Sequence, residues 1–210
     1  LRMSRGLGDV YKRQPTDNVK GVTASLLEGL SYGAGDAVLG LNPAIDNVKS
    51  TTDILNLFND VKSRLKIPTQ ICVLSHITTQ LKALKSGAPM DLCFQSIAGS
   101  EKALASFGTD VDMLAEANEL MASKGTSIGP NYMYFETGQG SELSSNSHNG
   151  ADQLVMESRC YGLARHYNPF LVNTVVGFIG PEYIYDTKEL IRAALEDNFC
   201  GHMHGLPMGC

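Results

Sequence analysis

The segment Tyr134–Ser141 (YFETGQGS) places one carboxylate directly before a glycine-rich turn. An apolar run delivers Glu136 at its end, and Gly138 and Gly140 then allow the backbone to approach a ligand closely. Ser144 and its neighbours add small hydrogen-bonding groups. This pattern is typical of a ligand site at the end of a strand. It is equally typical of a solvated loop in which the glutamate has no role, and spacing alone does not separate the two.

Polar residues follow other apolar runs in the same way. Asn42 and Pro43 come directly after the run that ends at Leu41. A short amide there can orient a hydroxyl or an amine, but an asparagine that starts a turn before proline explains the pair as well. His76 also ends a run, yet no serine or cysteine nucleophile pairs with it in a recognisable motif.

Three further patterns argue against common functions. The Gly33–Asp36 segment precedes an apolar run instead of following one, which is the wrong context for a dinucleotide fingerprint. His202 and His204 would share one face of an expected strand, but no third ligand stands nearby, so we predict no metal site. The five cysteines are scattered and form no CxxC motif, and we expect most of them to be buried as small apolar residues.

Short apolar runs alternate with helical patterns along the chain. The expected strands are 36–41, 70–75, 91–95, 132–137, 171–178 and 202–208. The expected helices are one capped by Ser50, a short one near 77–85, and those over 110–124, 152–166 and from Asp186 onward. Strand and helix alternate about six times, which predicts an α/β fold with a parallel sheet.

Two features favour a TIM (β/α)8 barrel over an open sheet. The strand–helix unit recurs without a break, and several strands end in polar residues that a barrel would bring to one pocket. These residues are Asn42, His76, Gln95, Glu136 and Asn173. Because eight units need about 250 residues, we expect an incomplete barrel of about six units.

Composition limits the function further. Apolar residues make up 43% of the chain, and the net charge is -5 without a long basic run, so we expect a globular protein that does not bind nucleic acid. No segment approaches the roughly 20 consecutive apolar residues of a membrane helix, and the start has no secretory signal. We therefore expect a soluble protein of the cell interior.

Six longer stretches resemble the large, catalytic subunit of ethanolamine ammonia-lyase. They are LSYGAGDA at 30–37, GLNPA at 40–44, FQSIAG at 94–99, MYFETGQG at 133–140, VNTVVGFIGPEY at 172–183 and GLPMGC at 205–210. The stretches are family-specific and stand in the expected order, and the resemblance spans residues 15–210. It implies the central part of a TIM-barrel subunit.

The resemblance also implies a chemistry. The family uses adenosylcobalamin to convert ethanolamine to acetaldehyde and ammonia by a radical mechanism in ethanolamine degradation. Its large subunit pairs with a small subunit in a hetero-oligomer. The expected location is the cytoplasm, free or within a bacterial microcompartment.

Site residues follow from the matched motifs. Glu136 matches the family's substrate-binding glutamate, and its carboxylate would hold the ammonium group and act in catalysis. Asn42 matches a substrate-binding asparagine that would serve the hydroxyl. Pro43, Gln95 and Ser144 match positions that contact the cofactor, and Ser96, Phe107 and Phe178 are expected pocket walls.

The chain also departs from the family. Residues 1–14 do not resemble it, and we interpret them as a foreign leader or an assembly artefact. Arginine and glutamine on the family's first strand have no equivalent here, and a second substrate carboxylate would come directly after Cys210. We therefore expect this chain by itself to be inactive.

Two other hypotheses remain open from the sequence. The chain could come from a different TIM-barrel lyase or aldolase that uses Glu136 as a general base without cobalamin. It could also be a non-catalytic assembly subunit that keeps only the scaffold.

Overall fold

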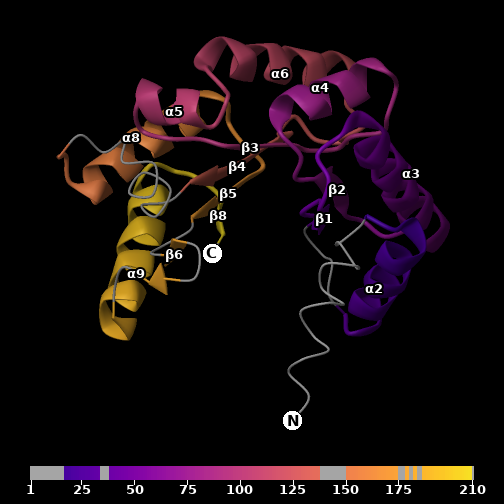
Figure 1. The fold of residues 1–210 in the computed structure, drawn as a ribbon, viewed down its shortest axis with the longest axis horizontal. Coiled ribbons are helices and arrows are strands. Elements are labelled where there is room, and N and C mark those ends of the chain that lie inside the picture. Colours follow the sequence, from indigo (N-terminus) through magenta and orange to yellow (C-terminus); the bar gives the residue numbers. More distant parts are fainter. Residues whose placement is uncertain are drawn as a thin grey trace, which may run out of the picture.

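The structure is a computed structural model that describes residues 17–33, 38–137, 150–174, 178–179, 182–183 and 186–209. In Figure 1 the helices form an outer arc, and most of the strands lie along its inner side. The helices are α2 (Val19–Ser31), α3 (Val48–Leu65), α4 (Ile77–Lys85), α5 (Glu101–Ser106), α6 (Val111–Lys124), α8 (Gln153–His166) and α9 (Thr187–Met203).

The strands on the inner side of the arc are parallel and follow chain order. They are β1 (Val38–Leu41), β2 (Gln70–Val73), β3 (Cys93–Ser96), β4 (Met133–Thr137), β5 (Leu171–Thr174) and β8 (Met208–Gly209). β1 pairs with β2, and β3, β4, β5 and β8 form a second sheet in that order. The N–H of Leu92 donates to the carbonyl of Ile71, which makes β2 and β3 neighbours. The predicted α/β class with parallel strands is confirmed.

The two faces of the strands have different surroundings. Cys93, Phe135 and Val172 belong to the large core between strands and helices. Alternate positions, such as Phe94 and Tyr134, form a smaller cluster on the opposite face, where their rings meet edge to face at 5.3 Å. Side chains that share the parity of Phe94 and Tyr134 therefore point away from the helices. We call this side the inner face.

Three helices begin where they were predicted, each with an aspartate as its N-cap, although of these three a cap was predicted only for Asp186. The carboxylates of Asp110, Asp152 and Asp186 each accept hydrogen bonds from backbone N–H groups in the first turn of α6, α8 and α9. The predicted cap at Ser50 is wrong, because Asn47 occupies that position and accepts from the N–H of Ser50 at 2.9 Å. Helices α2 and α5 were not predicted.

The predicted strand over 202–208 is wrong for most of its length. Helix α9 continues to Met203, and His204 is its C-cap. The N–H of Gly205 donates to His202 and that of Leu206 to Gly201, while Gly205 adopts a φ of +75°. These bonds form a Schellman motif, which ends the helix at a left-handed glycine. His202 and His204 therefore do not share a strand face.

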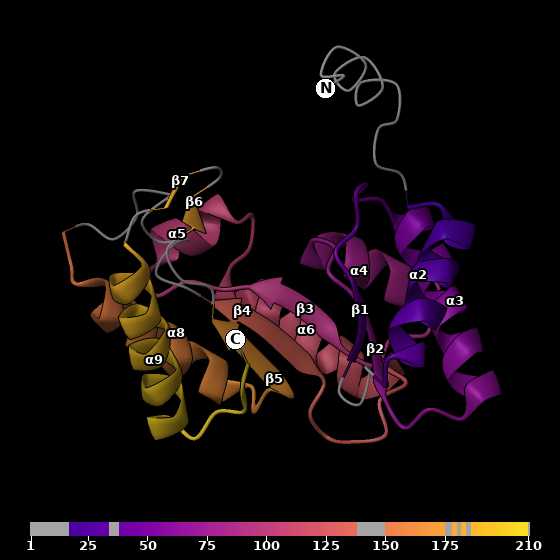
Figure 2. The same ribbon diagram turned by 90° about the horizontal axis from the view of Figure 1, so that it is seen from below.

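A short antiparallel pair was also not predicted. β6 (Phe178–Ile179) pairs with β7 (Glu182–Tyr183), whereas one continuous strand was expected over 171–178. β5 ends at Thr174. Figure 2 shows β6 and β7 apart from the parallel strands β3, β4 and β5, with which they share no sheet.

Candidate active site at the carboxyl ends of the strands

Four residues stand in one line across neighbouring strands near their carboxyl ends. Ser96 on β3 is the register partner of Glu136 on β4, which is the partner of Asn173 on β5, and Asn173 is the partner of Gly209 on β8. We call these four residues the Glu136 row. The row shares the parity of Phe94 and Tyr134, so its side chains lie on the inner face. On the inner face, the aromatic side chains of Phe94 and Tyr134 therefore lie next to the polar Glu136 row.

Glu136 is half-buried. Its carboxylate forms no hydrogen bond or ion pair with any residue in the described part of the chain, whereas most buried polar groups in proteins are paired. Burial raises the pKa of Glu136 above its ordinary value. A desolvated carboxylate without a partner is suited to bind a cation or to accept a proton.

Asn42 and Pro43 follow β1 at the same end of the sheet. Asn42 is exposed, and its parity with Val38 places it on the inner-face side of the strand end. The turn after Pro43 is held by Asp17, whose carboxylate accepts from the N–H groups of Ala44 at 2.8 Å and Ile45 at 3.0 Å.

Gln95 does not share a face with Glu136, contrary to our expectation that Asn42, Gln95 and Glu136 open onto one surface. It is 3% exposed and has the parity of Phe135, which packs toward the helices. Its Oε1 accepts from the N–H of Ile77 at 3.1 Å, and its Nε2 donates to the carbonyl of Ser96 at 2.9 Å. The Gln95 amide thus joins β3 to the start of α4.

A hollow of about 280 Å³ lies between the ends of β2 and β3. It brings together the predicted residues Gln95, Ser96 and Phe107, together with His76. The Nε2 of His76 donates to the carbonyl of Phe107 at 2.8 Å, and its Nδ1 accepts from the N–H of Thr78 at 3.3 Å. His76 is therefore the N-cap of α4 and also holds the turn that carries Phe107.

Two predicted residues cannot be placed in this site. Ser144 lies outside the described residues. Phe178 is the first residue of β6, but the structure describes only its backbone and not its side chain.

A buried carboxyl network behind the site was not predicted. Glu157 on α8 accepts from the hydroxyl of Thr137, and the hydroxyl of Thr174 lies 3.4 Å from Glu157 and 3.2 Å from Asp197 on α9. Burial, with the nearby charge of Asp197, raises the pKa of Glu157 to about 7, although the bond from Thr137 lowers it. The alternation of side chains along β4 could have indicated this network, because it points Thr137 and Glu136 to opposite faces of the sheet.

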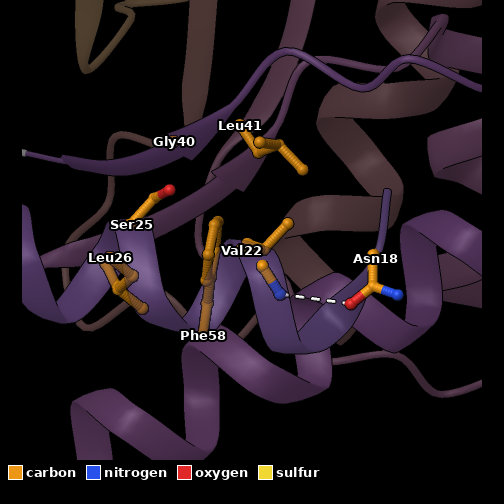
Figure 3. Close-up of a pocket in the computed structure, with 8 residues that line it drawn as sticks. Asn18, Val22, Ser25, Leu26, Gly40, Leu41 and Phe58 are labelled. Carbon is orange, nitrogen blue, oxygen red and sulfur yellow. Dashed lines mark hydrogen bonds between the residues drawn. The ribbon is translucent and has the colours of Figure 1, made fainter. Parts of the chain in front are cut away.

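The described residues offer few other sites. A hollow of about 370 Å³ separates α2 from β1, and Figure 3 shows its apolar lining, with Val22, Leu26 and Phe58 around Gly40. Its polar side chains are Ser25 and Asn18, and Asn18 already caps α2. Within the described ranges, no three His, Cys, Asp or Glu side chains cluster as a metal site would require, and no helix is long and apolar enough to cross a membrane.

Comparison with known proteins decides the family. The family model for the ethanolamine ammonia-lyase large subunit (EutB) matches residues 10–210. The chain belongs to this family. It is 55% identical over 194 residues to the ethanolamine ammonia-lyase large subunit of Salmonella typhimurium, and 54% identical over 194 residues to that of Escherichia coli K12. Each match covers 92% of this chain and 43% of the relative, so the chain spans less than half the length of these relatives.

Proposed function

We propose that the chain forms part of an adenosylcobalamin-dependent ethanolamine ammonia-lyase, in which Glu136 binds the ammonium group of ethanolamine. The observation that carries the proposal is the half-buried Glu136 without a partner among the described residues, at the carboxyl edge of the strands in a chain of this family. The reaction would release acetaldehyde and ammonia.

The proposed architecture is an incomplete (β/α)8 barrel of about six units. Support comes from parallel strands that follow chain order, with helices on their outer side, as Figure 1 shows. In a barrel, the carboxyl ends of the strands form the active-site rim, which agrees with the location of the Glu136 row.

The geometry suggests how this chain would handle its substrate. The Glu136 carboxylate would accept N–H bonds from the substrate ammonium, and a charge-assisted bond of this kind contributes about 1.5–3 kcal/mol. Asn42 would orient the hydroxyl from the end of β1. The Phe94 and Tyr134 layer beneath Glu136 would exclude water from the reacting carbons.

The residues near this edge fit a large and mostly neutral cofactor. Amide, hydroxyl and apolar groups lie there without a competing charge. They belong to exposed Asn42, to half-buried Pro43 and Ser96, and to Phe107 beside the hollow. Pro43, Gln95 and Ser144 would contact the cofactor, and Ser96, Phe107 and Phe178 would form pocket walls. When bound, adenosylcobalamin supplies the organic radical that starts the reaction.

The proposed assembly follows the relatives' names, which describe large subunits. A large subunit implies a small one, so we propose a hetero-oligomer with the small subunit of ethanolamine ammonia-lyase. The proposed location is the cytoplasm, free or within a bacterial microcompartment.

The test uses the full-length large subunit purified with its small subunit. Acetaldehyde and ammonia should form from ethanolamine only when adenosylcobalamin is added. The raised pKa of Glu136 would also suit a general base, so a lyase or aldolase without cobalamin is the second candidate. That candidate would be favoured if the protein turns over a carbonyl substrate without adenosylcobalamin and does not turn over ethanolamine in its presence.

A further inference from the structure

Asn173 is the immediate neighbour of Glu136 in the Glu136 row. The two residues are register partners on adjacent parallel strands, which lie about 4.7–4.9 Å apart, and they share the inner face. Asn173 is half-buried, like Glu136. Its side chain therefore lies beside the carboxylate proposed to hold the substrate.

The Asn173 amide is oriented by Tyr134. Its Nδ2 donates to the Tyr134 hydroxyl at 2.5 Å, and Tyr134 is held in turn by its ring contact with Phe94. Burial raises the pKa of Tyr134 to about 12, so the hydroxyl keeps its proton at neutral pH. With Nδ2 occupied, the amide presents Oδ1, which has no hydrogen-bond partner among the described residues.

Gly209 gives this oxygen the space it occupies. A Cβ added at Gly209 would lie 2.2 Å from Asn173 Oδ1, which is far inside van der Waals contact. Any larger residue at this position would displace the Asn173 amide. The glycine on β8, the tyrosine on β4 and the asparagine on β5 thus fit together around one acceptor atom.

We propose that Asn173 is a second substrate-binding residue, whose Oδ1 accepts an ammonium N–H beside the Glu136 carboxylate, and that Tyr134 is its positioning residue. This inference rests on the proposed function. An ammonium group carries three N–H donors, more than one carboxylate oxygen can satisfy, so a neutral acceptor on the adjacent strand complements it.

The experiment compares Asn173→Ala, Asn173→Asp and Tyr134→Phe in the full-length subunit with its small subunit. Asn173→Ala removes the acceptor and should raise KM for ethanolamine about tenfold or more. Asn173→Asp keeps an acceptor and should stay within about threefold of the wild-type KM, while Tyr134→Phe should give an intermediate rise. Adenosylcobalamin affinity, measured by equilibrium dialysis, should not change in any of them.

The matched control is Asn131→Ala, because Asn131 precedes β4 at the opposite end of the strands and bonds only to exposed Asn168 among the described residues. It should leave KM unchanged. A purely structural role for the bond between Asn173 and Tyr134 predicts that Tyr134→Phe is as impaired as Asn173→Ala, since both break that bond. That result, or an unchanged KM in Asn173→Ala, would overturn the inference.

The outcomes also separate the two proposals. Wild-type protein that does not turn over ethanolamine would refute the proposed function and this inference with it. Only the role of Asn173 would be refuted if the wild type is active, Glu136→Gln is impaired and Asn173→Ala is unaffected. Melting curves identify an unfolded variant, in which case the remaining two substitutions decide.

Discussion

At the residue scale, Glu136 and Glu157 show how a strand gives two glutamates different environments. Both carboxylates lie near the end of β4, one on each side of the sheet. Glu136 projects from the inner face without a partner in the described part, whereas Glu157 reaches the helix side from α8 and is 1% exposed. Only the first has the access that a substrate needs.

The environment of Glu157 predicts a pH-dependent stability. Its pKa is about 7 in the folded state against an ordinary 4.5. Below about pH 4.5 Glu157 is protonated in both the folded and the unfolded state, so it does not affect stability. Between about pH 4.5 and 7 it ionises in the unfolded state but stays protonated in the folded state. The free energy of unfolding therefore falls as pH rises, by at most about 3 kcal/mol.

The substitution Glu157→Gln should remove this pH dependence, because glutamine does not ionise. Melting temperatures of the full-length subunit, measured between pH 4.5 and 8, should converge for variant and wild type at the acidic end. At the alkaline end the variant should be relatively more stable. Exposed Glu119→Gln on α6 is the control and should follow the wild type throughout. Parallel curves for Glu157→Gln and wild type would contradict the assigned pKa.

The candidate site was only partly predictable from residue types. Glu136 and Asn42 became candidates because each ends an apolar run. The role of Gln95 in joining β3 to α4 was missed, although strand alternation already implies that Gln95 and Glu136 point to opposite sides in this register. The register itself depends on contacts between distant segments, which local patterns do not contain.

At the scale of elements, the sequence predicted best where local chemistry decides the structure. Asp110, Asp152 and Asp186 begin helices as expected, because a cap needs only the next three residues. The strand expected over 202–208 is wrong for most of its length, because α9 continues to Met203 and the left-handed Gly205 ends it there. The β6–β7 pair has two residues in each strand, too few for a periodicity to be visible.

The buried ion pair between α3 and the strands supplies a stability prediction. Asp91 is 0% exposed and accepts from Lys62 Nζ at 2.5 Å, from the Ile71 N–H at 2.9 Å and from the Thr126 hydroxyl at 2.6 Å. Asp91→Ala leaves all three donors without their acceptor and should destabilise the fold by about 3–5 kcal/mol.

The control for Asp91 is Asp53→Ala, which breaks an exposed pair with Lys49 within α3. This change should cost less than about 1 kcal/mol, because exposed pairs contribute little. Urea denaturation of the full-length subunit measures both values. Equal losses for the two variants would contradict the role of the Asp91 cluster in joining α3, β2 and the segment after α6.

At the scale of the whole molecule, the chain spans 43% of the length of its curated relatives. Under the proposed barrel, the rim that holds substrate is shared among many strands, so parts of the relatives beyond this match would contribute to it. We predict that the 210-residue chain, assayed alone with ethanolamine and adenosylcobalamin, forms no acetaldehyde, whereas the full-length subunit with its small subunit does. Turnover by the chain alone would contradict this division of the site.

The most direct test of the account is Glu136→Gln in the full-length subunit with its small subunit. Glutamine keeps the size and loses the charge, so kcat/KM for ethanolamine should fall about 10–100-fold or more, while adenosylcobalamin affinity stays at the wild-type value. The exposed Glu119→Gln variant should keep wild-type kinetics. Wild-type turnover by Glu136→Gln, or a loss of cofactor binding that accounts for its lost activity, would contradict the assignment of Glu136 to the substrate ammonium.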